Sequence, residues 1–120
     1  MIEIATRKEL DTFLQAGTFV IFKHSPACGL SGRAHRQLQQ FCGAHPETPV
    51  GIVDVLSSRT ISDELERRTG IRHESPQIFI LHGGTVVWQT SHHSITKESI
   101  ALQWKLAEAR KGAPVVSTVG

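Results

Sequence analysis

Two residues in the stretch FKHSPACGLSGRAHRQL, residues 22–38, have the types and spacing for thiol chemistry. Cys28 lies between an apolar run typical of a strand and a segment with helical periodicity. A cysteine in the first turn of a helix is close to the positive end of the helix dipole and to unpaired N–H groups, and both favour the thiolate. Because the thiolate is the nucleophile in disulfide exchange, Cys28 is a candidate nucleophile. Ser31 stands where a second cysteine would complete Cys-x-x-Cys.

Each of these two residues also has a purely structural interpretation. Cys28 would then be a small buried residue at a turn, although the short residues at 25–27 and Gly29 argue against deep burial. The Ser31 hydroxyl either donates a hydrogen bond to the Cys28 sulfur or binds the backbone of its own helix turn. The sequence leaves these two roles of Ser31 open.

A second feature is the stretch TGIRHESPQIFI, residues 69–80, in which Pro76 immediately precedes a strand pattern. Proline is tolerated at the first residue of a strand. It is also the residue that accommodates a cis peptide bond, which is rare and usually purposeful. Nothing local decides between the two.

Hydrophobic periodicity gives the elements that position these residues. Thr6 and Glu9 form a capping box, and the helix that they begin stops near Gly17. Counting a short apolar piece before this helix as a first strand, the predicted order is β-α-β-α-β-α-β-β-α. The further elements are a strand at 18–24, helices at 28–44 and 59–69, a strand at 50–56, a hairpin at 77–90 around Gly83-Gly84, and a helix at 95–111 capped by Thr96. We expect one domain over 1–111 and a flexible tail over 112–120.

Composition narrows the function classes. The chain has 120 residues and a formal net charge of +2, too weak a charge to indicate nucleic-acid binding. The seven histidines, the pair His92-His93 included, lack the spacing of a metal site. No apolar run reaches membrane length and no targeting segment is evident, so we expect a cytoplasmic protein without a membrane partner. In that compartment the two cysteines stay reduced.

The segments FKHSPACGLS and GIRHESPQIFILHGGTVV together resemble the thioredoxin fold, and this resemblance covers residues 1 to about 111. The closer resemblance is to the YtxJ-like family of monothiol bacilliredoxins, in FKHS…C…S, in HESPQ and in overall length. It implies an α/β thioredoxin-like fold with a central mixed sheet and helices on both faces. It also implies that Cys28 is the nucleophile, that Ser31 occupies the resolving position, and that Pro76 is a cis-proline beside Cys28.

The chemistry implied by this resemblance is the removal of bacillithiol, a low-molecular-weight thiol, from protein mixed disulfides. The partners would be S-bacillithiolated client proteins, with bacillithiol as co-substrate and no tightly bound cofactor. The backbone of Ser75, before the cis-proline, would pair with an extended substrate. Because bacillithiol carries carboxylates, a basic rim would help to bind it, and the candidates are Lys23, Arg33 and Arg72. His24 is expected to pack at the strand end rather than to act as a cation beside the thiolate.

Cys42 lies 14 residues after Cys28, which is about 21 Å along one helix and too far for a disulfide. It is interpreted as a core thiol. Two alternatives to the bacilliredoxin hypothesis remain. CGLS is similar to the Cys-Gly-Phe-Ser of cluster-binding monothiol glutaredoxins, although the paired glycines fall inside the hairpin here and after it there. The other is a non-catalytic interaction module, in which Cys28 would react no faster than Cys42.

Overall fold

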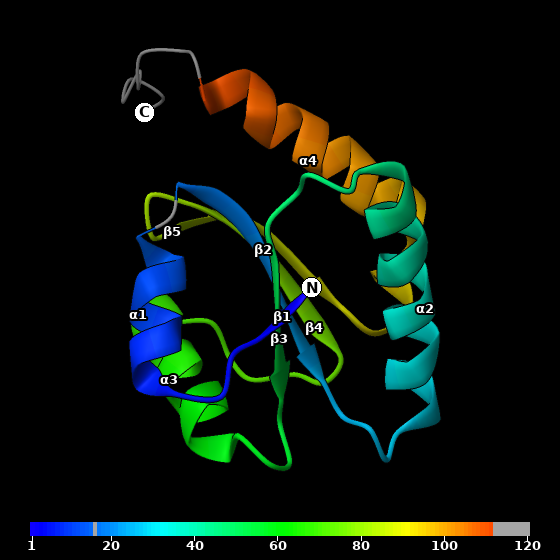
Figure 1. Cartoon of the computed structure of the whole chain (residues 1–120). Helices are drawn as coiled ribbons and strands as arrows, with labels where there is room; N and C mark the ends of the chain where they lie inside the picture. The colour runs from blue at the N-terminus through cyan, green and yellow to red at the C-terminus, as the bar shows by residue number, and fades with distance from the viewer. Residues whose placement is uncertain (16, 112–120) are drawn as a thin grey trace.

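One mixed sheet of five strands runs through the computed structural model, which describes residues 1–15 and 17–111 (Figure 1). The strands are β1 (Ile2–Glu3), β2 (Thr18–His24), β3 (Val50–Asp54), β4 (Gln77–His82) and β5 (Thr85–Ser91). They lie in the order β1-β3-β2-β4-β5. Strand β3 is parallel to β1 and β2, whereas β4 is antiparallel to β2 and β5. The predicted alternation of strands and helices, followed by an antiparallel hairpin, is therefore confirmed.

Four α-helices and one short 3₁₀ helix cover the two faces of this sheet. They are α1 (Arg7–Leu14), α2 (Gly29–Ala44), α3 (Arg59–Thr69), the 3₁₀ helix η1 (His92–Ser94) and α4 (Lys97–Lys111). Helices α1 and α3 lie on one face, and α2 and α4 lie on the other (Figure 1). This is the predicted thioredoxin-like α/β arrangement with helices on both faces.

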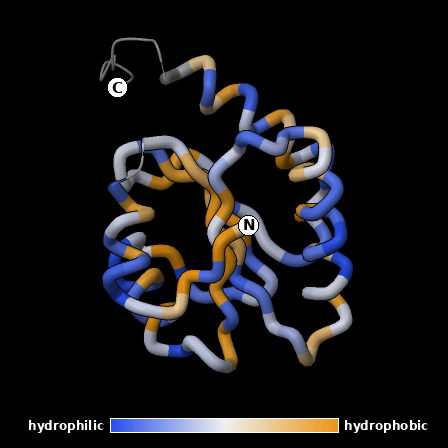
Figure 2. The backbone as a smooth tube through the Cα atoms, viewed as in Figure 1, coloured by the Kyte–Doolittle hydropathy of each residue, from blue (hydrophilic) through white to orange (hydrophobic). Residues whose placement is uncertain are grey.

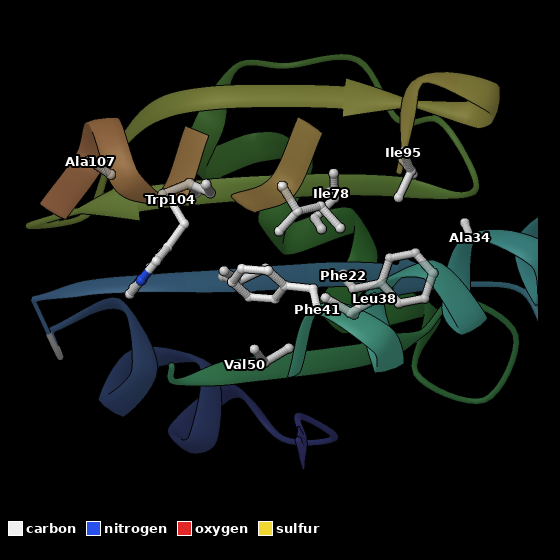
Figure 3. Packing of buried hydrophobic residues seen from close by; sticks show 12 residues of the cluster. Phe22, Ala34, Leu38, Phe41, Val50, Ile78, Ile95, Trp104 and Ala107 are labelled. Carbon is white, nitrogen blue, oxygen red and sulfur yellow. The ribbon is translucent and has the colours of Figure 1, made fainter. Parts of the chain in front are cut away.

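The continuous apolar run of β2 is explained by this double cover. Val20 and Phe22 belong to the core cluster under α2 and α4, whereas Phe19 and Ile21 belong to the cluster under α1 and α3. In Figure 2, hydrophobic residues run along the strands at the centre of the molecule, whereas hydrophilic and hydrophobic residues alternate along the helices. In Figure 3, Phe22, Leu38 and Phe41 lie together in the first cluster, close to Ile78. Each successive residue of β2 therefore points into a different core.

The predicted helix ends are largely confirmed. Thr6 and Glu9 form the capping box, Gly70 has a left-handed φ of 69°, and the N–H of Ser99 donates to Oγ1 of Thr96 at 3.0 Å. Helix α1 stops at Leu14, three residues before Gly17.

One boundary differs from the predicted one, and one element is additional. Strand β3 ends at Asp54 rather than at 56, because Oδ1 of Asp54 accepts the N–H groups of Leu56 and Ser57 and turns the chain. The helix η1 was not predicted.

Two expectations concern the ends of the chain and membranes. The predicted flexible tail, residues 112–120, lies outside the described residues. Among the residues that the structure does describe, no helix has the length and apolar character needed to cross a bilayer.

Candidate active site

Cys28 is the residue that begins helix α2. It is the N-cap, with an extended backbone of φ −110° and ψ 124°, and its side chain makes no capping hydrogen bond. Its N–H donates to the carbonyl of Ser25 at 3.0 Å, and its carbonyl accepts from the N–H of Gly32 at 3.1 Å. The residue is half-buried. A thiol at this position lies at the positive end of the helix and is partly open to a reaction partner.

Ser31 is fully buried in the first turn of the same helix. Its hydroxyl accepts a hydrogen bond from the N–H of Ser25 at 2.9 Å and lies 2.8 Å from Nδ1 of His24. Of the two roles that the sequence left open, the structure supports hydrogen bonding to the backbone. Ser31 therefore fastens the loop that carries Cys28 to the end of β2.

His24 ends strand β2 and packs between aromatic rings. Its ring stacks on Phe22 at 5.6 Å and lies 4.6 Å from the ring of His35. Burial lowers the pKa of His24, the nearby His35 lowers it further, and Asp54 acts in the opposite direction. His24 is therefore neutral near pH 7, which agrees with the expected packing role rather than with a cation beside the thiolate.

The Ser75–Pro76 peptide bond is cis, as the family resemblance implied. Pro76 is buried and its carbonyl accepts the N–H of His92 at 3.0 Å. Oγ of Ser75 is buried as well and has no hydrogen-bond partner among the described residues.

The short helix η1 holds this proline loop close to helix α2. Arg33, in the first turns of α2, donates a hydrogen bond to Nδ1 of His93 at 3.0 Å, while the N–H of His92 binds Pro76. The two segments singled out in the sequence thus meet at one end of the sheet. Sequence reasoning missed the part played by His92 and His93, although the adjacent pair directly after a hairpin was a visible signal.

Residues 2–100 match the family described as monothiol bacilliredoxin BrxC. The chain belongs to this family. The match covers most of the chain and includes Cys28, Ser31 and the cis-proline loop, so the family resemblance seen in two short segments extends over residues 2–100.

Solved structures similar to this bacilliredoxin share its fold. A thioredoxin-fold protein proposed to be an oxidoreductase is 27% identical, with a TM-score of 0.79 over 89% of this chain and 92% of that one. The oxidised mitochondrial thioredoxin 3 of Saccharomyces cerevisiae is 16% identical, with a TM-score of 0.70 over 88% and 93% of the two chains. The thioredoxin of Fasciola hepatica is 14% identical, with a TM-score of 0.71 over 89% and 99%. The last two similarities establish the fold alone.

The three predicted basic residues of the bacilliredoxin differ in placement. Arg33 and Arg72 are exposed, one on each of the two site segments. Lys23 is not part of an exposed rim, because its side chain is fully buried and its amine has no partner among the described residues. Lys23 follows Ile21 on the α1 and α3 side of β2, where alternation along the strand places it. Burial lowers the pKa of Lys23 to about 8, although Glu66, Asp63 and Glu74 raise it.

Arg72 lines an open groove beside the cis-proline loop. The groove is shallow and open, with a volume of about 410 Å³. Its lining comes from the segment before β4, the first residue of β4, the end of β5 and the start of η1: Ile71, Arg72, Glu74, Gln77, Gln89, Ser91 and His92. A larger hollow of about 620 Å³ is lined by Thr18 and Trp104, among others. Because Thr18 begins β2 and Cys28 follows its end, the larger hollow lies at the far end of the strand from the candidate nucleophile.

Cys42 is half-buried in helix α2 and packs against the core cluster under α2 and α4. Burial raises the pKa of its thiol. Both cysteines are free. Cys42 is therefore a packing residue with a weakly acidic thiol, at the edge of the core rather than buried inside it as predicted.

Proposed function

We propose that this bacilliredoxin removes bacillithiol from protein mixed disulfides, with Cys28 as the nucleophile. The observation that carries the proposal is the position of Cys28. Cys28 is half-buried at the N-cap of α2, and its side chain makes no capping hydrogen bond. Helix α2 is joined through η1 to the cis-proline loop. Thiol–disulfide exchange needs a thiolate that is both stabilised and accessible, and a helix N-terminus supplies the stabilisation.

The exchange begins with attack by the Cys28 thiolate on the bacillithiol sulfur of a client mixed disulfide. A new disulfide forms between Cys28 and bacillithiol while the disulfide to the client breaks. The client sulfur leaves with the electron pair as a thiolate and takes up a proton from water. The client is thereby reduced, and Cys28 carries the bacillithiol.

Release of Cys28 requires a second thiol from outside this helix. Ser31 holds the position of a resolving cysteine, and Cys42 lies in the second half of α2, about 21 Å along the helix. A second bacillithiol thiolate, or another redoxin, would attack the bacillithiol sulfur of the adduct and release the Cys28 thiolate. With bacillithiol, the product is its symmetrical disulfide, so electrons balance.

The client would lie along the cis-proline loop. Ser75 precedes Pro76 and its backbone continues toward β4, so an extended client segment can add hydrogen bonds there as a strand would. Arg33, exposed in the first turns of α2, is proposed to face the bound thiol on the Cys28 side.

The test is intact-mass spectrometry after incubation with a client loaded with bacillithiol. The same client loaded with glutathione and a Cys28→Ser variant serve as the matched comparisons. Transfer of the bacillithiol mass to the wild-type chain alone supports the proposal. Transfer of glutathione only would retain the chemistry and reject bacillithiol as co-substrate. Transfer of neither thiol would reject Cys28 as the nucleophile. Cluster binding and a non-catalytic interaction module would then be the hypotheses to test.

A further inference from the structure

The groove beside the cis-proline loop lies where Gln77, the first residue of β4, pairs with Ser91, the last residue of β5. Its volume of about 410 Å³ lies in the range of small-molecule sites, which is roughly 300–1,000 Å³. Two segments distant in sequence form it, residues 71–77 and residues 89–92.

Gln77 gives the groove a fixed floor. Its side chain is 1% exposed and its polar atoms are already engaged. Oε1 accepts the N–H of Glu74 at 3.1 Å, and Nε2 donates to the carbonyl of Arg72 at 3.1 Å. The backbone that carries Arg72 and Glu74 is therefore held in place before any ligand arrives.

His92 forms the opposite wall in an unusual backbone conformation. Its φ is 55°, in the left-handed region that non-glycine residues seldom adopt. This conformation lets its N–H bind the Pro76 carbonyl at 3.0 Å and places Nε2 3.5 Å from Oε1 of Glu74. Residues held in sparsely populated conformations cluster at functional sites, and here the conformation brings the His92 ring to Glu74.

Two opposite charges remain available in this groove. The guanidinium of Arg72 makes no hydrogen bond or ion pair with any residue that the structure describes, since only its carbonyl is engaged. Glu74 contacts His92 through Oε1 only, so within the described part of the chain its second oxygen is free. A free guanidinium and a free carboxylate oxygen in one groove complement a ligand that carries both charges, whereas a purely anionic ligand would be repelled by Glu74.

We propose that this groove binds the charged part of a zwitterionic low-molecular-weight thiol, with Arg72 on a carboxylate and Glu74, positioned by His92, on an ammonium group. This inference rests on the proposed function and adds the specificity site to it. Bacillithiol has this chemistry, because its malate moiety carries carboxylates and its cysteine moiety carries a free amine. Glutathione is also zwitterionic, but its ammonium group lies on the γ-glutamyl residue, farther from the sulfur, and its cysteine nitrogen is part of an amide. The groove borders the cis-proline loop, because His92 binds Pro76, and the next residue binds Arg33 of α2, the helix that Cys28 precedes.

The first experiment measures the rate of thiol transfer to Cys28 from one client loaded with either bacillithiol or uncharged 2-mercaptoethanol. We expect Arg72→Gln to slow bacillithiol transfer about tenfold, as loss of a charge-assisted hydrogen bond would. Transfer of mercaptoethanol should stay within about twofold, because that thiol offers no carboxylate to Arg72. Lys105→Gln, which removes an exposed charge from α4, is the matched control and should change neither rate.

The second experiment tests Glu74 with bacillithiol whose amine has been acetylated. Wild type should transfer the free amine form faster, and Glu74→Gln should abolish that preference while leaving the acetylated form unchanged. Glu47→Gln, which removes an exposed carboxylate from another loop, should keep the preference. His92→Gly keeps the backbone conformation accessible and removes the side chain, so it should weaken the preference as Glu74→Gln does.

Several outcomes would overturn the inference. Equal slowing of both thiols by Arg72→Gln would mean that Arg72 contacts the client and not the thiol. Unchanged rates for Arg72→Gln, or an unchanged amine preference for Glu74→Gln, would mean that the groove is not the thiol site. The mercaptoethanol reaction separates these results from a failure of the proposed function. If the wild-type chain accepts neither thiol, then Cys28 is not the nucleophile, and both the proposed function and this inference are wrong.

Discussion

The hydroxyl of Ser31 lies 2.8 Å from Nδ1 of His24 while it accepts the backbone N–H of Ser25 at 2.9 Å. The position at which a dithiol site has its second cysteine therefore holds a buried structural contact. This contact ties the first turn of α2 to the last residue of β2, across the loop that ends in Cys28. In this monothiol site, a buried hydroxyl that holds the loop before Cys28 therefore stands where a dithiol site has its second sulfur.

Replacement of Ser31 by alanine should lower the stability of the chain. The change leaves the Ser25 N–H and the His24 ring without their buried partner, which costs about 1–3 kcal/mol. Urea unfolding under reducing conditions measures the loss, and Ser94→Ala, at an exposed serine of η1, is the control. Equal unfolding midpoints for the two variants would show that the Ser31 contact contributes nothing to stability.

The two cysteines should differ in their alkylation by iodoacetamide. Cys28 is at the N-terminus of α2 with an unengaged side chain, whereas burial raises the pKa of Cys42. Since the thiolate is the reacting species, we expect Cys28 to react at least about tenfold faster at pH 7. Peptide mass mapping over a time course at several pH values gives both rates from one sample. Equal rates would remove the case for a nucleophilic Cys28.

Replacement of Lys23 by methionine should stabilise the chain at neutral pH. The wild type carries a buried ammonium without a partner among the described residues, and its pKa of about 8 lies below the ordinary 10.5. An unfolded chain then binds more protons than the folded one between about pH 8 and 10.5, so wild-type stability rises over that interval. Below pH 8 the full cost of burying the Lys23 ammonium lowers the free energy of unfolding of the wild type. We expect Lys23→Met to raise that free energy by on the order of 2 kcal/mol there.

Urea unfolding at pH 7 and pH 9.5 tests this sign. The gap between Lys23→Met and wild type should narrow at the higher pH, whereas Lys8→Met, at an exposed lysine of α1, should show no such trend. Thiol transfer by Lys23→Met should match the wild-type rate, because a buried amine cannot reach a bound thiol. Slower transfer would mean that Lys23 contributes to thiol binding after all. A stability difference between Lys23→Met and wild type that does not change with pH would mean that the charge on Lys23 does not cause the difference.

The sequence allowed the nucleophile and its helix to be predicted, because Cys28, the apolar run before it and the stripe after it are local patterns. The cis-proline came from the family resemblance rather than from any residue near Pro76. The burial of Lys23 could not be read locally, since it depends on α3 and on the segment before β4, which fold over the end of β2 from far along the chain. The groove was missed although the hairpin was predicted, because the register that pairs Gln77 with Ser91 and the conformation of His92 were not predicted.

Replacement of Glu64 by glutamine should weaken the attachment of α3 to its neighbours and remove an acid-sensitive part of the stability. Glu64 is 7% exposed and forms ion pairs within α3 with Arg67 and, at 2.7 Å, with Arg68. Two further ion pairs connect this network to α1. Glu64 lies 3.8 Å from Arg7, and Arg68 lies 2.6 Å from Asp11. Hydrogen bonds from Arg67 and Arg68 lower the pKa of Glu64 to about 2 from 4.5. A carboxyl with a depressed folded pKa contributes stability that is complete above pH 4.5 and is lost as the pH falls toward 2.

Thermal unfolding between pH 2 and pH 7 tests this network. Glu64→Gln should melt at a lower temperature than wild type at pH 7, and the two curves should converge as Glu64 becomes protonated. Glu108→Gln, at an exposed carboxylate of α4, should follow wild type throughout. A constant difference between Glu64→Gln and wild type across the whole pH range would mean that packing, rather than the charge on Glu64, holds α3 in place.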